Sequence, residues 1–361
     1  MTPGLLPRRL SNQGLARPAF RQPEDVVAWF GAVQAQDYLG SLWAIGQRVR
    51  RCTEADVEAA EARRVIVRTW PMRGTLHFVA AADARWMTRW LAPRVIARNA
   101  ARWRRDFDVD ARRVGRADEI VARALEGGRR LTRDALYAAL ESRRMATGGS
   151  RGLHLLLVLA MRGRLCLAGR VGKQHSFALL DEWLPAAPEL DRDAALAELA
   201  VRYFTSHGPA TERDLAWWAG ITLADARLGI DGSRHRLECE SLDGETFWRG
   251  AVRRARAAAP ASPHVRLLPA YDEYTVAYAD RAPLVESRSR LDARGMGLLS
   301  PAVLVDGRVI GTWSRTIKGD RVNVAVRAAR RITRDENLAL RDAVAGYGRF
   351  LDLDASLTDR A

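Results

Sequence analysis

The chain has 361 residues and a mass of 40.1 kDa, more than one ordinary core requires, which predicts two to four modules. Hydrophobic residues make up 48% and charged residues 28%, a composition that excludes a disordered chain and is typical of a folded protein. The formal charge of +15 favours a polyanionic partner such as nucleic acid, although only Lys173 and Lys318 of the 58 basic residues are lysines, so codon bias contributes to the surplus.

Several classes of protein are excluded by what the sequence lacks. The three cysteines lie far apart and form no CxxC pair, which argues against a disulfide framework and a zinc site and favours the reducing cytoplasm. The first residues lack the apolar core of a signal peptide, and the longest apolar stretch, residues 155–161, is too short to cross a bilayer. Phosphate-binding glycine loops, HExxH and GxSxG are absent. We therefore expect no metal, no cofactor and no membrane partner.

The first module, residues 1–112, begins with short helices. Residues 23–34 carry an acidic start and apolar residues at helical spacing, which predicts a helix. Thr53 is the predicted N-cap of a second helix, which has acids in its first turn. Residues 65–80 are rich in β-branched and aromatic residues and are broken by Pro71 and Gly74, which predicts a hairpin. Helices followed by a two-stranded hairpin are typical of a winged helix.

The same pattern of helices and a hairpin recurs twice, in modules at residues 113–190 and 191–256. In the second module Thr132 is the predicted cap of a helix. In the third, Gly208 and Pro209 break the chain, and Thr211 caps a helix whose inward residues are Leu215, Trp218 and Ala219.

The last module, residues 257–361, follows a small, proline-rich linker at residues 257–265. Residues 265–281, 301–314 and 321–327 read as strands, with a tight turn at Asp306 and Gly307. A final helix closes the chain. The predicted fold is α+β: three tandem winged-helix modules and a small C-terminal β-barrel or curled sheet.

Gln34 and Gln36 form the first candidate site, at what the pattern makes the end of a helix. If that end is extended, both amides point to one side and could hold and aim one water. The alternative is a helix end whose glutamines bond unpaired carbonyls, and the spacing alone favours this alternative.

Two further polar clusters have structural alternatives. Arg73, Thr75 and His77 could grip a phosphate from one face of a strand, or form the polar outer face of a wing. Asp272, Glu273 and Asp280 could act as acid and base, although acids that protect a strand edge are the favoured interpretation.

Five stretches resemble a known family in their order along the chain: "VQAQDY", "RGTLHFV", "HGPAT" with "DLAWWAG", "LLPAYDEY" and "VDGRVIGTW". Together they resemble the winged-helix DNA-binding family whose characterised members are the AlkZ-like DNA glycosylases. The resemblance runs from about Leu10 to about Leu351.

This resemblance implies a C-shaped clamp around duplex DNA, built from three winged helices and the barrel. It implies hydrolysis of the N-glycosidic bond of N7-alkylated purines, including interstrand crosslinks made by DNA-alkylating antibiotics. The family's catalytic motif is glutamine, a small or aliphatic residue, then glutamine or aspartate. Gln34-Ala35-Gln36 matches the double-glutamine form, which is associated with antibiotic self-resistance.

The resulting hypothesis is a monomeric, nucleoid-associated DNA glycosylase of the cytoplasm that acts on duplex DNA with alkylated or crosslinked purines. Gln34 and Gln36 are its catalytic residues. The candidates for shaping the site or contacting DNA are Asp37, Arg73, Thr75, His77, Asp272, Tyr274, Arg288 and Arg290. A non-catalytic transcription regulator is the alternative, because winged helices and a positive charge would serve it equally well.

Overall fold

The structure, a computed structural model, describes residues 4–172, 174–251, 262–285 and 299–358. The chain divides into two units. The first comprises Met1–Val57, Leu196–Trp218 and Thr222–Ala361, and the second comprises Glu58–Ala195 and Ala219–Ile221. Both contain helices and strands, so the α+β prediction is confirmed, while the division into four modules stays a prediction.

The first unit begins with α1 (Leu5–Asn12), α2 (Pro23–Phe30), the short strand β1 (Val33–Gln34) and α3 (Tyr38–Gly46). Pro23 and a capping box between Gln22 and Asp25 start α2. Gly31 ends it with a φ of +79°, a conformation that glycine adopts without strain. The prediction of a helix through residue 34 was therefore wrong, because the signal of Gly31 outweighs the apolar spacing beyond it.

Helix α4 (Glu54–Ala62) follows, and its predicted cap is confirmed, since the Thr53 hydroxyl accepts from the backbone N–H of Asp56 at 3.3 Å. The chain returns to the first unit in α10 (Arg192–His207), α11 (Glu212–Ala219), α12 (Leu223–Gly232), η1 (Arg234–Arg236) and the hairpin of β7 (Leu237–Leu242) and β8 (Glu245–Gly250). Thr211 caps α11 as predicted, and Leu215 and Trp218 are fully buried.

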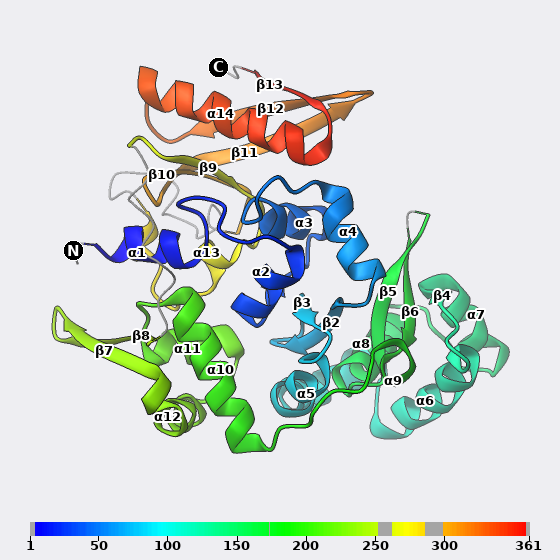
Figure 1. The fold of residues 1–361 in the computed structure, drawn as a ribbon. Coiled ribbons are helices and arrows are strands. Elements are labelled where there is room, and N and C mark those ends of the chain that lie inside the picture. Colours follow the sequence, from blue (N-terminus) through cyan, green and yellow to red (C-terminus); the bar gives the residue numbers. More distant parts are fainter. Residues whose placement is uncertain (1–3, 173, 252–261, 286–298, 359–361) are drawn as a thin grey trace. The chain divides into compact units, whose positions relative to one another are not determined.

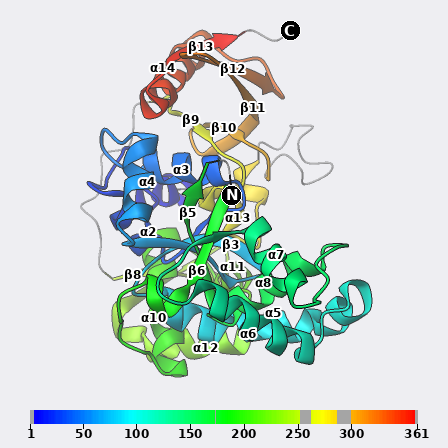
Figure 2. The same cartoon turned by 90° about the vertical axis from the view of Figure 1, so that its right-hand side faces the viewer.

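A five-stranded sheet ends the first unit, in the order β13-β12-β11-β10-β9. Its strands are β9 (Val265–Leu268), β10 (Ala302–Val305), β11 (Arg308–Lys318), β12 (Arg321–Ala328) and β13 (Asp354–Thr358). Figure 2 shows how the sheet curls. Since β9 and β13 are its two edges, it is a curled half-barrel and not the closed barrel that was one expectation. Asp306 and Gly307, both with positive φ, form the predicted turn.

The segment after β9 differs from the sequence prediction. A strand was expected to continue to residue 281, but β9 ends at Leu268 and is followed by the one-turn helix α13 (Glu273–Val276) and by η2 (Ala282–Leu284). The Asp272 carboxylate accepts from the backbone N–H of Tyr274 at 2.9 Å and so caps α13. Asp272 and Glu273 are buried, so the edge-strand interpretation of these acids was wrong.

Helix α14 (Arg334–Leu351) packs against this sheet and begins with a capping box between Thr333 and Glu336. The Glu336 carboxylate also accepts two hydrogen bonds from Arg330, at 2.7 and 2.8 Å. The Arg330 hydrogen bonds, with the backbone N–H of Thr333, lower the pKa of Glu336 to about 2.

We expect this carboxylate to make the protein's stability depend on pH. A depressed pKa in the folded state adds stability above the unfolded pKa of about 4.3, and that stability is lost as the pH falls toward 2. Replacing Glu336 with Gln should cost roughly 1–2 kcal/mol at neutral pH, because solvent screens the partly exposed Arg330. Urea unfolding at pH 7 and pH 3 measures the difference, which should shrink at the lower pH. An equal loss at both values would contradict this account.

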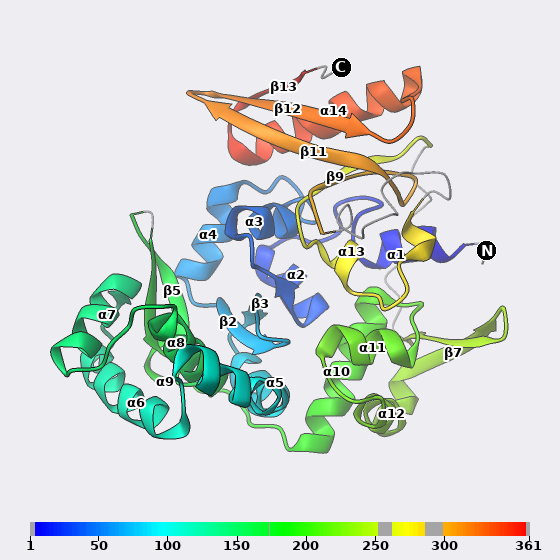
Figure 3. The same ribbon diagram turned by 180° about the vertical axis from the view of Figure 1, so that it is seen from behind.

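The second unit contains a sheet in which β3, β2, β5, β6 and β4 are neighbours in that order. Its elements are β2 (Ile66–Met72), β3 (Thr75–Ala80), α5 (Ala84–Phe107), α6 (Ala111–Leu125), β4 (Leu131–Thr132), α7 (Arg133–Ser142), α8 (Arg151–Met161), β5 (Leu165–Val171), β6 (Gln174–Leu179) and α9 (Leu180–Trp183). Helices α6, α7 and α8 lie together beside the β5–β6 hairpin (Figure 1; Figure 3). Both predicted hairpins and the Thr132 cap are confirmed.

The core of the second unit is built from the apolar faces of these helices and from Trp70 and Trp103, which are both buried. Of the predicted linker, residues 257–261 lie outside the described residues, and so does the loop with Arg288 and Arg290. Among the residues that the structure describes, no helix has the length and apolar character to span a membrane.

Candidate functional site

Gln34 and Gln36 lie on an extended segment between α2 and α3. Gln34 is the second residue of β1, and Gln36 follows in a bend before α3 begins at Tyr38. Val33 and Ala35 are buried, whereas Gln34 is half-buried and Gln36 is exposed. The alternation of buried and accessible residues is typical of an extended chain through Gln34, and the chain then bends at Gln36. The explanation of the two glutamines as a helix end is wrong, since α2 stops at Phe30.

The buried carboxylate of Glu273 fixes the backbone of this segment. The backbone N–H of Gln34 donates to Glu273 Oε1 at 2.8 Å, and the indole N–H of Trp218 donates to Glu273 Oε2 at 2.8 Å. Glu273 is 1% exposed and Trp218 is fully buried. A buried carboxylate is stable only when it is hydrogen-bonded, so Glu273 needs both donors. Because it bonds both, it holds the Gln34 backbone at a fixed place relative to the Trp218 indole.

His207 completes the surroundings of this carboxylate. Its Nε2 lies 3.4 Å from Glu273 Oε2, and its ring stacks on Tyr203 with 4.8 Å between the ring centroids. Complete burial lowers the pKa of His207 in spite of the nearby carboxylate. The imidazole is therefore neutral near pH 7, and it supports the site instead of exchanging protons with it.

An ion pair anchors α13, the helix that carries Glu273. Two guanidinium nitrogens of Arg48 donate to the two carboxylate oxygens of Asp272 at 2.7 and 2.8 Å. Arg48 also donates to the Gln13 carbonyl at 2.9 Å, and both members of the pair are buried. The Gln13 amide in turn donates to the Tyr278 hydroxyl at 3.0 Å. The support of the site is thus a connected and fully buried polar network.

Asp37 stands directly before α3 and is exposed. Gly40 allows a close approach here, because a Cβ on this glycine would lie 2.6 Å from the Asp37 carboxylate and 3.2 Å from Pro269. Asp37 thus follows the two glutamines without being part of the buried network.

Arg73, Thr75 and His77 belong to the second unit, and they were expected to alternate along one strand face. The structure instead places Arg73 in the turn before β3, with a φ of +57°. His77 is fully buried, so a polar outer face is also wrong. The ring N–H of His77 donates to the Thr75 carbonyl at 2.9 Å, which leaves Nε2 to accept from Arg73 at 3.0 Å. The three residues are therefore brought together as one hydrogen-bonded unit.

Tyr274 is buried, and its hydroxyl donates to the Gly307 carbonyl at 2.9 Å, so it supports the turn of the half-barrel. Sequence reasoning missed Glu273 as the partner of Gln34, and it missed Arg48 and His207 altogether. An available signal was the position of two adjacent acids among aromatic residues, because charged residues rarely occur there without a buried partner.

The chemical capacity of the segment is limited to positioning. Amides donate and accept hydrogen bonds but do not ionise, so Gln34 and Gln36 can orient a water and cannot act as strong acids or bases. The described part of the chain also has no group of three or more His, Cys, Asp or Glu residues arranged to hold a metal ion.

Known proteins resemble this chain over most of its length. Residues 27–350 match the family described as DNA glycosylase AlkZ-like. An interstrand DNA cross-link repair glycosylase of Streptomyces sahachiroi is 28% identical over 331 residues, which cover 84% of this chain and 85% of that protein. The solved structure of the DNA glycosylase AlkZ from Streptomyces sahachiroi has the same fold, with a TM-score of 0.77, 24% identity, and coverage of 98% of this chain and 97% of the other. The chain belongs to the family of AlkZ-like DNA glycosylases.

Proposed function

We propose that this protein is a monofunctional DNA glycosylase that hydrolyses the N-glycosidic bond of N7-alkylated purines and unhooks interstrand crosslinks made by a DNA-alkylating natural product. The observation that carries the proposal is the extended Gln34-Ala35-Gln36 segment, whose backbone is bonded to the buried carboxylate of Glu273. Family membership and the distant relationship to a cross-link repair glycosylase support it. The role would be base excision repair or self-resistance.

The chemistry suits two neutral amides. Alkylation at N7 gives the purine a positive charge, so the bond between C1′ and N9 is weakened and the base leaves with little protonation. The enzyme must then supply a positioned water and electrostatic support for an oxocarbenium-like sugar. Gln34 and Gln36 would hold that water between them, each as donor or acceptor.

Electrostatics also favour this arrangement. A carboxylate next to the DNA phosphates would be repelled, whereas amides carry no charge. The Glu273 carboxylate, which accepts from the backbone N–H of Gln34, is buried, so it would position this backbone and would not contact the substrate. A crosslinked base is tethered to both strands and cannot be flipped into a deep pocket, so catalytic residues on an accessible segment suit such a lesion.

The proposed partner is duplex DNA, bound by a monomer. The charge of +15 supports this partner, since each arginine that meets a phosphate releases a counterion. We propose that the protein belongs to the double-glutamine subgroup, because Gln34 and Gln36 match its motif.

The test is release of free modified base. The full-length protein is incubated with a duplex that contains one N7-methylguanine, with an unmodified duplex, and with a duplex crosslinked through N7 of two guanines. We expect free N7-methylguanine and an abasic site without strand cleavage, and no release from the unmodified duplex. Binding to one particular sequence with no base release from any alkylated duplex would identify a transcription regulator instead.

We expect Glu273 to act as a positioning residue for Gln34. In Glu273→Gln, the new amide nitrogen cannot accept a hydrogen bond, so either Gln34 or Trp218 loses its acceptor. The rate of base release at saturating enzyme should fall about tenfold, while the dissociation constant for the duplex stays within about threefold, because the surface that meets DNA is unchanged.

Asp280→Asn is the matched control, since Asp280 is an exposed acid in the stretch after α13, and its hydrogen bond among the described residues is a local one, from the backbone N–H of Ala282. It should leave the rate unchanged. If Glu273→Gln weakens DNA binding and the release rate to the same extent, the residue serves the fold alone and has no positioning role.

A further inference from the structure

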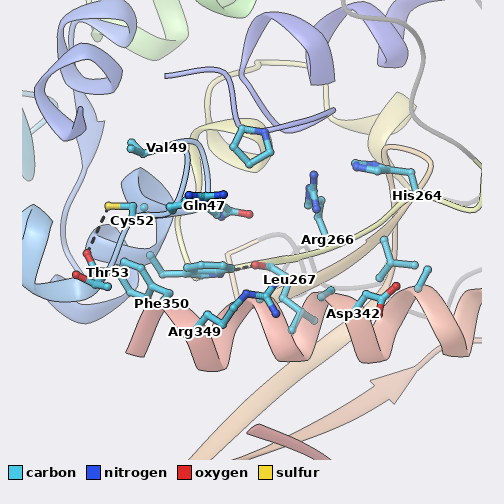
Figure 4. A pocket seen from close by; sticks show the side chains of 18 of the residues that line it. Gln47, Val49, Cys52, Thr53, His264, Arg266, Leu267, Asp342, Arg349 and Phe350 are labelled. Carbon is cyan, nitrogen blue, oxygen red and sulfur yellow. Dashed lines mark hydrogen bonds between the residues drawn. The ribbon is translucent and has the colours of Figure 1, made fainter. Parts of the chain in front are cut away.

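The first unit contains a cavity of about 610 Å³ that takes no part in the proposed reaction. Its walls come from the C-terminal end of α3 and the segment after it, from β9 and from α14 (Figure 4). Gln34, Gln36 and Glu273 do not line it. The volume is within the range of small-molecule sites in proteins, about 300–1,000 Å³.

Gln47 is the unusual residue of this cavity. It follows the last turn of α3, is 8% exposed, and lies on the wall between Cys52 and Arg266 (Figure 4). Neither its Nε2 nor its Oε1 has a hydrogen-bond partner among the described residues. Most buried side-chain amides are hydrogen-bonded, because desolvation without a partner is costly. The side chain therefore presents an adjacent donor and acceptor to whatever occupies the cavity.

A second polar atom without a partner among the described residues belongs to His264, the residue before β9, which also lines the cavity. The His264 ring bonds the backbone of Ala16, and its buried Nε2 has no partner among the described residues. Burial and the positive charge of Arg266 lower the pKa of His264 to about 4. The imidazole is therefore neutral at pH 7, and its Nε2 is a hydrogen-bond acceptor.

The charge of the cavity is positive. Arg51, Arg266 and Arg349 line it against a single acid, Asp342. Arg266 is held in place by hydrogen bonds to the carbonyls of Leu15 and Ala16, at 2.7 and 3.4 Å, whereas Arg51 and Arg349 are exposed at the surface. The lining also includes apolar side chains, among them Val49 and Leu267.

We propose that this cavity binds a nucleotide, with the edge of the base against Gln47 and the phosphate toward the arginines. A primary amide with both groups free matches the adjacent donor and acceptor of a base edge and can bond it in two places. Guanidinium groups bind phosphate in the same bidentate way. An apolar ligand would leave the buried amide unsatisfied, and inorganic phosphate offers no base edge to pair with it. The nucleotide is either free or part of a DNA strand.

The experiment is calorimetric titration of the full-length protein with the four 5′-deoxynucleoside monophosphates, with deoxynucleosides and with inorganic phosphate. We expect at least one monophosphate to bind with a Kd below about 1 mM, tighter than inorganic phosphate. Gln47→Leu keeps the buried volume and removes the amide, so it should weaken that binding about tenfold, the loss expected for one base-edge contact. Its Tm should not fall, because it removes an amide that has no partner within the described structure.

Two arginines of α14 provide a matched pair of variants. Arg349 lines the cavity and Arg341 does not, although both are exposed. Arg349→Ala should weaken the binding of the monophosphate and leave the binding of the deoxynucleoside unchanged, whereas Arg341→Ala should change the binding of neither ligand. The proposal is overturned if no monophosphate binds, if Gln47→Leu binds as tightly as the wild type, or if inorganic phosphate binds equally well.

Competition distinguishes the two sources of the nucleotide. If a single-stranded hexanucleotide displaces the bound monophosphate, the cavity accepts a nucleotide of a DNA strand; if it does not, the ligand is a free nucleotide. Both results retain the same contacts with Gln47. The protein with Gln34 and Gln36 changed to Ala should bind the monophosphate normally, so a failure of the glycosylase proposal would not affect this one.

Discussion

Changing Gln34 and Gln36 together to alanine is expected to slow base release by roughly 10²–10³-fold, the usual effect of removing groups that position a reactant or stabilise developing charge. The two amides are the only part of the proposed machinery that would meet the attacking water. The buried residues that fix the backbone of this segment, Glu273, Trp218 and His207, would remain in place. Single-turnover rates on a duplex with one N7-methylguanine measure the loss, and the dissociation constant for that duplex should change by less than about threefold.

Asp37→Asn distinguishes positioning from proton transfer. Asp37 is exposed next to the two glutamines and is the nearest side chain in sequence that could take a proton from water. If the glutamines position the water, this variant should keep most of the activity, because the step then needs no carboxylate to take a proton. A loss in Asp37→Asn as large as that of the double variant would assign the water to the carboxylate.

Features that depend on neighbouring residues were predictable from the sequence. Thr53, Thr132 and Thr211 cap helices because a hydroxyl needs only the N–H groups two or three residues further on. The turn at Asp306 and Gly307 was predictable for the same reason, since it depends on two residues that tolerate positive φ. The sequence left two alternatives for the glutamines, a helix end or an extended segment. Gly31 ends helix α2 before them, so they lie outside the helix.

Features that depend on distant residues were not predictable. Glu273 is 239 positions from Gln34, and Arg48 is 224 positions from Asp272. In the sequence these acids stand in an apolar, aromatic stretch that is typical of a strand, and only the fold supplies the donors that allow them to be buried. The substrate class could not follow from the residues either, since two glutamines acquire a catalytic meaning only through the resemblance to the family.

The Arg48–Asp272 pair is expected to be the most sensitive point of the fold outside the apolar core. Arg48→Met should lower the free energy of unfolding by about 3–5 kcal/mol, because it leaves a buried carboxylate without its two guanidinium donors. Urea unfolding at pH 7 measures the loss. Arg227→Met is the control, since Arg227 makes the same kind of paired contact with Glu212, at 2.7 and 3.0 Å, on an exposed surface, and its loss should be small.

The double variant Arg48→Met with Asp272→Leu separates the charge from the cap. Removing both charges abolishes the uncompensated burial, so part of the lost stability should return. The recovery should stay incomplete, since Asp272 also caps α13 through the backbone N–H of Tyr274, and leucine cannot accept that hydrogen bond. Because α13 carries Glu273, base release by the double variant should remain below that of the wild type even where the protein is fully folded. Full recovery of both stability and rate would mean that the pair neither caps nor orients this helix.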